Sequence, residues 1–299
     1  MMDKNMFREV VLEEFYRQLP EGYSLTVKDT VKMNDVKMTG ICVTKDGSDI
    51  GRVAYVENMY ESYQAGNEAP EEIVSQFMHM LIDNSAEMCN GHLFTSEDIL
   101  ENCSYRMANK HTNQERLQGA LTKDVPGMDD IVIYPVYEVE IEGRHGTVII
   151  TDRMAEEKGL TVDQIHTAAE ANTEKRVEII SLSERLGNMI GEMAPFDSPF
   201  YVTHDTASES DEATILGAPS VLSRQKEPCY IIPSSRHELL FLPKSFEMDV
   251  EKLKDLVHEV NSQVLNPEDY LSDNVYELNE GKIITHASDL GRSRQPVQE

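Results

Sequence analysis

The stretch "PSSRHE" at residues 233–238 gathers two hydroxyls, an imidazole and a carboxylate within a few positions. These side chains can perform nucleophilic catalysis, in which an imidazole takes the proton of an attacking serine. Ser234 or Ser235 is then the candidate nucleophile, His237 the candidate base and Glu238 a candidate catalytic carboxylate. The same stretch can also be a turn, in which the hydroxyls hydrogen-bond to nearby backbone groups.

The residues around this stretch favour the turn. A G-x-S-x-G nucleophile elbow needs glycines, and none stands near Ser234. The zinc motif H-E-x-x-H needs a second histidine where Phe241 stands. The flanking runs "YII" and "LLFLP" are short, apolar and bounded by proline, which favours two strands over a helix. We therefore predict a hairpin, with catalysis as the alternative; His204, at a strand end, is a second candidate base.

Other catalytic and cofactor signatures are missing from the sequence. There is no phosphate-binding glycine loop, and the acidic stretch 205–214 lacks the glycine and the final glutamate of a calcium loop. The four cysteines are widely spaced without a C-x-x-C pair, which predicts free thiols: Cys42, Cys89, Cys103 and Cys229. The sequence thus predicts no metal site and no cofactor, and it favours a protein without enzymatic activity over an enzyme.

The chain is strongly acidic. Its 299 residues include 54 Asp and Glu against 27 Lys and Arg, a formal net charge of −27. Such a surface repels nucleic-acid phosphates and anionic membranes, so we expect neither to be a partner. The acids are spread along the chain, as in a solubility feature, although they could also imitate nucleic acid. With no apolar signal-peptide core and no apolar run of membrane-spanning length, we expect a soluble cytoplasmic protein.

The first half shows a helix, a small sheet and further helices. Apolar residues at helical spacing predict a helix over 7–19, alternation predicts strands over 23–29, 36–45 and 49–57, and Pro70 opens a helix that runs to about Met88. A short helix is expected after Thr95. The loop 123–130 is the predicted boundary, which gives an N-terminal lobe over 1–125, a C-terminal lobe over 130–286 and a disordered tail over 287–299.

The second half alternates strands and helices. Strands are expected over 130–143, 145–151 and 199–205, on both sides of the "PSSRHE" turn, and as a closing pair. Thr161 and Gln164 form a capping box for a helix over 161–172, and a short helix is expected over 183–193. A strong helix begins near Asp249, with six apolar residues on one stripe: Val250, Leu253, Leu256, Val257, Val260 and Val264. The prediction is an α+β fold of antiparallel sheets with packed amphipathic helices, in two lobes.

Four motifs occur in a fixed order in the second half: "ITD" at 150–152, "AEANT" at 169–173, "PSSRHE" at 233–238 and "LSDNVY" at 271–276. In this order they resemble an uncharacterised domain-of-unknown-function family of Firmicutes, common in gut anaerobes. The resemblance covers about 132–278 and is loose in the first half. It implies an α+β fold and a soluble intracellular protein, and it supplies no activity.

The favoured function is a non-enzymatic intracellular binding or adaptor protein, in which the acidic surface and the "PSSRHE" hairpin contact a protein partner or a small ligand. Candidate contact residues within the motifs are Thr151, Asp152, Asn172 and Arg236. The alternatives are a hydrolase with Ser234 or Ser235 as nucleophile, and an acidic inhibitor that mimics nucleic acid. Convergence of the motif residues on one pocket favours an enzyme or a ligand-binding protein; dispersal means that each motif holds its own turn.

Overall fold

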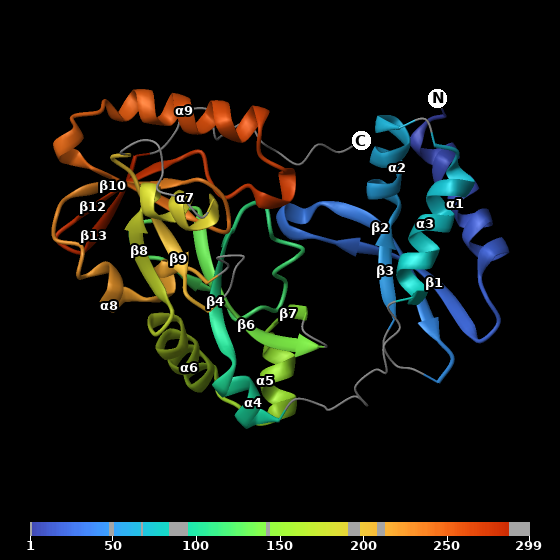
Figure 1. Cartoon of the computed structure of the whole chain (residues 1–299). Helices are drawn as coiled ribbons and strands as arrows, with labels where there is room; N and C mark the ends of the chain where they lie inside the picture. The colour runs from blue at the N-terminus through green and yellow to red at the C-terminus, as the bar shows by residue number, and fades with distance from the viewer. Residues whose placement is uncertain are drawn as a thin grey trace. The chain divides into compact units, whose positions relative to one another are not determined.

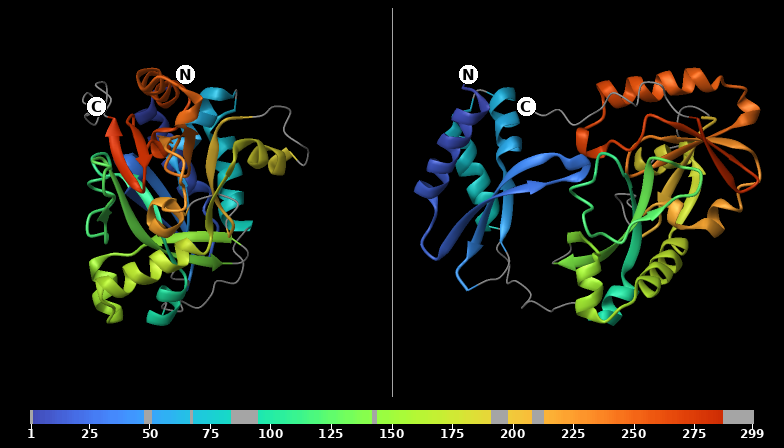
Figure 2. Two further views of the ribbon diagram at one scale, coloured as in Figure 1. Left: turned by 90° about the vertical axis from the view of Figure 1, so that its left-hand side faces the viewer. Right: turned by 180° about the vertical axis from the view of Figure 1, so that it is seen from behind.

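The computed structural model describes residues 2–47, 51–66, 68–83, 95–141, 144–190, 198–207 and 213–286 (Figures 1 and 2). The chain divides into two compact units. Unit 1 comprises Met1–Lys32 and Val36–Leu93, and unit 2 comprises Met33–Asp35 and Phe94–Glu299. Cys89 and the tail predicted to be disordered over 287–299 lie outside the described residues.

The described part of unit 1 is a three-stranded antiparallel sheet with three helices. Its elements are α1 (Lys4–Gln18), β1 (Tyr23–Val31), β2 (Lys37–Lys45), β3 (Arg52–Tyr55), α2 (Val56–Ala65) and α3 (Pro70–Asp83), with the strands in the order β1-β2-β3. Buried side chains from the sheet and all three helices form one core, among them Phe7, Ile41, Met59 and Ile73. The predicted first helix and three strands are confirmed, as is the helix at Pro70 as far as Asp83; its predicted end near Met88 lies outside the described residues.

The helix α2 was not predicted, because the strand expected over 49–57 ends at Tyr55 and the chain turns directly into the helix. Val56 and Met59 are both buried, at the spacing of a helical turn. The next turns place Tyr60 and Tyr63 against the Phe7 ring, at centroid distances of 5.3 and 5.0 Å. Aromatic packing at helical spacing therefore decides the secondary structure here.

Unit 2 carries the remaining elements, α4 to α9 and β4 to β13. The first group is α4 (Ser96–Glu101), β4 (Cys103–Asn109), β5 (Lys123–Asp124), β6 (Ile131–Ile141), β7 (Arg144–Ile149), α5 (Asp152–Lys158), α6 (Val162–Glu174), β8 (Val177–Ser181) and α7 (Leu182–Ile190). The second group is β9 (Tyr201–Asp205), α8 (Pro219–Leu222), β10 (Cys229–Pro233), β11 (Leu239–Pro243), α9 (Val250–Gln263), β12 (Val275–Asn279) and β13 (Lys282–His286). Of these, β4, β5, α5, β8 and α8 had no counterpart in the prediction.

Two antiparallel sheets build unit 2. One places β4, β6 and β5 side by side, with β7 also paired to β6; the other has the order β13-β12-β10-β11-β9-β8. Both sheets and α6 contribute to one large core, represented by Tyr105, Ile165 and Phe241. The helix α9 packs through Leu253 and Val257 on a smaller apolar cluster of the six-stranded sheet. The predicted α+β class with antiparallel sheets and packed helices is confirmed.

The division between the units does not fall in the loop at 123–130. Leu121, Val125 and Met128 are buried in the same core as Tyr105, and β5 pairs with β6 within this stretch. The stretch is therefore interior to unit 2, and the division lies between Leu93 and Phe94.

Ionic side chains connect the two sheets of unit 2; Arg106 and Asp205 are buried, and Glu138 and Arg176 are half-buried. The Arg176 guanidinium donates two hydrogen bonds to Asp205, at 2.7 and 2.6 Å, and two to Glu138, at 2.8 and 2.7 Å. Arg106 also binds Glu138, at 2.9 Å. Burial raises the pKa of the Glu138 carboxyl, but the Arg106 charge and the Arg176 hydrogen bonds outweigh it, so the pKa is lowered. These pairs connect β4, β6 and β9.

The "LSDNVY" motif forms a second polar network. The Asp130 carboxylate accepts hydrogen bonds from the hydroxyls of Ser272 and Tyr276, at 2.6 and 2.5 Å, and from the Asn274 amide at 3.0 Å. Burial and the Asp130 charge raise the pKa of the Tyr276 hydroxyl well above its ordinary value. The motif thus ties the start of β12 to the residue that precedes β6.

Candidate functional site

Residues 234–238 form the loop of a β-hairpin. β10 pairs antiparallel with β11, and Pro233 lies opposite Leu239 at the last rung before the loop. Both strands are interior to the six-stranded sheet, because β12 flanks β10 and β9 flanks β11. The predicted hairpin between two paired strands is confirmed.

The polar groups of this loop bind one another and a single neighbour. The Ser234 hydroxyl donates to Glu238 at 3.0 Å, and the Ser235 hydroxyl accepts from the backbone N–H of His237 at 3.1 Å. The His237 Nε2 lies 3.1 Å from an Asp269 carboxylate oxygen. Among the described residues, neither serine hydroxyl bonds to the His237 ring. The arrangement therefore contains a His–Asp pair without a bound nucleophile.

Arg236 supports the same contact. Its backbone N–H donates to the carbonyl of Asp269 at 2.9 Å, and its Nε lies 3.4 Å from the Asp269 carboxylate. Asp269 belongs to the short 3-10 helix Pro267–Asp269 that follows α9. The loop is thus fastened to the segment after α9 through three groups of two adjacent residues.

The other motif residues have separate structural tasks. Thr151 caps α5 by accepting from the Met154 N–H, and the Asp152 N–H donates to the carbonyl of Gly119 at 2.9 Å. The Asn172 amide donates to the carbonyls of three residues at the end of α4 and the start of β4: Leu100, Glu101 and Cys103. These contacts share no residue with those of the hairpin loop, so each motif holds its own turn.

The remaining candidates give no reaction centre within the described parts of the chain. His204 lies on β9 opposite Glu178 of β8. Burial raises the pKa of the Cys103 thiol to about 11 and that of the Cys229 thiol to about 12, so both are protonated at neutral pH and are poor nucleophiles. In these described ranges, no three His, Cys, Asp or Glu side chains are placed to hold a metal ion.

A hydrogen-bonded pair of the buried Tyr105 and the half-buried His166 was not predicted from the sequence. The Tyr105 hydroxyl and the His166 Nδ1 are 2.7 Å apart, and burial raises the pKa of the tyrosine and lowers that of the histidine. A neutral imidazole then accepts a hydrogen bond from the tyrosine hydroxyl. The pair joins β4 to α6 in the main core, and we assign it a structural task.

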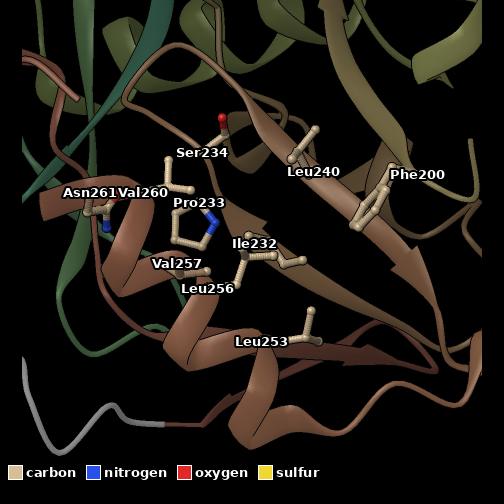
Figure 3. Close-up of a pocket in the computed structure, with 10 residues that line it drawn as sticks. All are labelled: Phe200, Ile232, Pro233, Ser234, Leu240, Leu253, Leu256, Val257, Val260 and Asn261. Atoms are coloured by element: carbon tan, nitrogen blue, oxygen red, sulfur yellow. The ribbon is translucent and has the colours of Figure 1, made fainter. Parts of the chain in front are cut away.

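The structure contains an apolar pocket between α9 and the hairpin, which we call the α9 pocket (Figure 3). It has a volume of about 100 Å³ and is lined by Phe200, Ile232, Pro233, Ser234, Leu240, Leu253, Leu256, Val257, Val260 and Asn261. Two members of the "PSSRHE" motif thus contribute to its wall. In Figure 3 the Ser234 hydroxyl points away from the apolar side chains, in agreement with its bond to Glu238.

The pocket exists because the apolar stripe of α9 is only partly covered. Leu253 and Val257 are buried against the sheet, whereas 48% of Leu256, 40% of Val260 and 79% of Val264 remain exposed. Leu256 and Val260 border the pocket, and Val264 does not. The prediction of a single apolar stripe holds, but half of its six residues face outward. The apolar stripe of α9 is wider than the face that the helix buries, and this width is the sequence feature that could have predicted the pocket.

Phe200 and Asn261 are further lining residues that sequence reasoning missed. Phe200 lies just before β9, and Asn261 is in the last turn of α9. Neither stands in a motif, and only the packing of α9 across the sheet brings both to the same pocket.

Comparison with known proteins gives one result at the level of families. A family model described as "Family of unknown function (DUF5688)" matches residues 4–279. This range includes the first half, where the resemblance found from motifs was only loose. No curated protein and no solved structure matches the chain. In the described ranges, no helix is long and apolar enough to cross a membrane.

Proposed function

The chain belongs to the family of unknown function DUF5688, and from this premise we propose that it is a non-enzymatic binding protein. The α9 pocket is its contact site. The observation that carries the proposal is an open apolar pocket that the "PSSRHE" hairpin itself helps to line, next to serine and histidine side chains that are engaged in structural bonds.

The size and lining of the pocket suit a small apolar group. Its volume of about 100 Å³ is comparable with the roughly 150 Å³ apolar cavity that is known to bind benzene in another protein. Leu256 and Val260 gain from being covered, because each Å² of apolar surface removed from water contributes about 25 cal/mol. A ring or branched alkyl group, free or on a partner's side chain, fits this description.

The proposal extends to compartment, origin and partners. The free thiols of Cys42, Cys103 and Cys229 support a reducing, cytoplasmic location, and the order of the four motifs supports an origin in Firmicutes. The net charge of −27 argues against nucleic acid or an anionic membrane as partner. The hydrolase alternative lacks a serine paired with a base, since the His237 ring bonds to Asp269 and, among the described residues, to neither serine hydroxyl.

Replacing Leu256 by Glu tests the contact site. The substitution places a charge at the pocket wall, where it should weaken binding of the probe p-cresol at least about 10-fold because the carboxylate must be desolvated. Binding is measured as saturable shifts of the methyl resonances of Leu256, Val257 and Val260 in the wild type, and of the two valines in the variant.

The matched control is Val264→Glu, which puts the same charge on an exposed residue of α9 outside the pocket. It should leave the affinity for p-cresol unchanged. Equal loss of affinity in both variants, or no saturable shifts in the wild type, would remove the α9 pocket as the contact site.

A further inference from the structure

Asn261 presents an unused hydrogen-bond acceptor at the α9 pocket. Only 6% of the residue is exposed. Its side-chain amide donates to the carbonyl of Ser272 at 2.9 Å and to the carboxylate of Asp273 at 2.8 Å. Both amide protons therefore have acceptors, which fixes the orientation of the side chain. Oδ1 is then the polar atom of the Asn261 side chain that is left for a ligand.

The Oδ1 atom has no donor among the residues that the structure describes. It also does not belong to the side-chain atoms that are both fully buried and unpaired, so it keeps access to the space around it. A carbonyl oxygen that lacks a protein donor is free to accept a hydrogen bond from a ligand. A ligand that brings a donor to this atom forms that hydrogen bond, whereas a hydrocarbon does not.

The neighbouring carboxylate strengthens the acceptor and sets the preferred charge. Asp273 is buried, and its second oxygen has no hydrogen bond; the His258 Nδ1 lies 3.7 Å from this oxygen. An amide whose N–H groups donate to a carboxylate is polarised, so its oxygen accepts more strongly. The same carboxylate repels an anion at this end of the pocket.

We propose that the α9 pocket selects neutral ligands that combine a ring-sized apolar body with one hydrogen-bond donor, such as phenols and compact alcohols. The apolar wall contacts the ring or alkyl body of the ligand, and the Asn261 Oδ1 accepts a hydrogen bond from its hydroxyl. This inference rests on the proposed binding function of the pocket and specifies the class of ligand.

Three probes of nearly the same shape test the inference on the full-length protein. These are p-cresol, which has a donor; p-xylene, in which a methyl replaces the hydroxyl; and 4-methylanisole, which keeps the oxygen without its proton. Dissociation constants are measured from the methyl shifts of Leu256 and Val260. Without a bond to Oδ1, burying the hydroxyl costs about 1–3 kcal/mol, so p-xylene would bind about 10-fold tighter than p-cresol.

The expected result is that p-cresol binds at least as tightly as p-xylene and at least about 5-fold tighter than 4-methylanisole. In Asn261→Ala the order should reverse in favour of p-xylene. Because each comparison uses two probes on one protein, general loosening of the pocket by the substitution cancels. If the variant does not fold, the wild-type ratios still decide.

The outcomes separate the two proposals. A pocket that binds p-xylene about 10-fold tighter than p-cresol overturns the donor preference and leaves the binding function standing. A protein in which none of the probes shifts these methyl groups overturns both. An unchanged order of probes in a folded Asn261→Ala overturns the assignment of the acceptor to Asn261.

Discussion

At the scale of single residues, Glu138 joins two arginines of unit 2. It accepts from Arg106 and Arg176, and Arg176 in turn holds the fully buried Asp205. Breaking a buried ion pair by removing one partner is strongly destabilising, because the other charge stays in the interior. The Glu138 pKa is lowered in the folded state, so the ionised form stabilises the fold.

Glu138→Gln should lower the free energy of unfolding by about 3 kcal/mol at pH 7. Since the folded-state pKa lies below the unfolded value of about 4.3, the charge contributes fully above that pH and its contribution is lost as the pH falls through the folded pKa. Urea denaturation at pH 7 and at about pH 3 should therefore show the difference between wild type and variant shrinking on acidification.

The exposed Glu178 of β8 provides the control. Glu178→Gln should change stability by less than about 0.5 kcal/mol at both pH values. A Glu138→Gln variant whose deficit is the same at both values would mean that its charge is not the stabilising feature.

At the scale of elements, α9 has two apolar rows with different tasks. Leu253 and Val257 attach the helix to the six-stranded sheet, and Leu256 and Val260 border the pocket while half exposed. A helix that used all six apolar residues for packing would leave no pocket. Because one row packs on the sheet and the other borders the pocket, we expect stability and ligand binding to respond to different substitutions on the same helix.

Leu253→Ala should cost about 2–5 kcal/mol, because it opens a cavity at a fully buried position. Leu256→Ala should cost less than about 1 kcal/mol and should weaken binding of p-cresol instead. Urea denaturation and the methyl titration measure the two effects. Equal costs for the two substitutions would show that Leu256 also serves as an anchor of the helix.

At the scale of the whole molecule, the chain is organised as two units divided after Leu93. The sequence placed the boundary at 123–130 because that stretch is rich in charge, proline and glycine. Its apolar members nevertheless lie in the core of unit 2, and β4 pairs with β6 along all seven residues of Cys103–Asn109. Residues 95–129 therefore belong to the second folding unit.

Two fragments distinguish these boundaries. A fragment over 95–286 should fold cooperatively, whereas one over 130–286 should not, because it lacks β4 and the buried Tyr105. Circular dichroism during urea denaturation gives the measurement. A cooperative transition for the shorter fragment would restore the boundary at 123–130.

The parts of the fold that local chemistry determines were predictable from sequence. The capping box of Thr161 and Gln164 and the start of α9 near Asp249 are present as expected, and proline-bounded apolar runs predicted the hairpin. The strand β4 was missed because all of its residues are buried, including Ser104, Arg106 and Asn109, so it shows no alternation.

Parts of the site depend on residues far apart in the chain and could not be predicted. Asp269 contacts His237 although the two are 32 positions apart in the chain. The Asn261 Oδ1 is identified as a free acceptor only because the amide protons of Asn261 bind Ser272 and Asp273. No spacing rule links such residues. The hairpin and the apolar stripe of α9 were thus predictable, whereas the pocket that forms between them was not.

The interior position of β10 and β11 in their sheet has a kinetic consequence. Pro233 and Leu239 are held by backbone pairing, and the loop between them is fastened to Asp269. The α9 pocket is thus preorganised, and a ligand can bind without a rearrangement of the loop. The association rate should then be limited by diffusion into the pocket, and ligands should differ in affinity mainly through their dissociation rates.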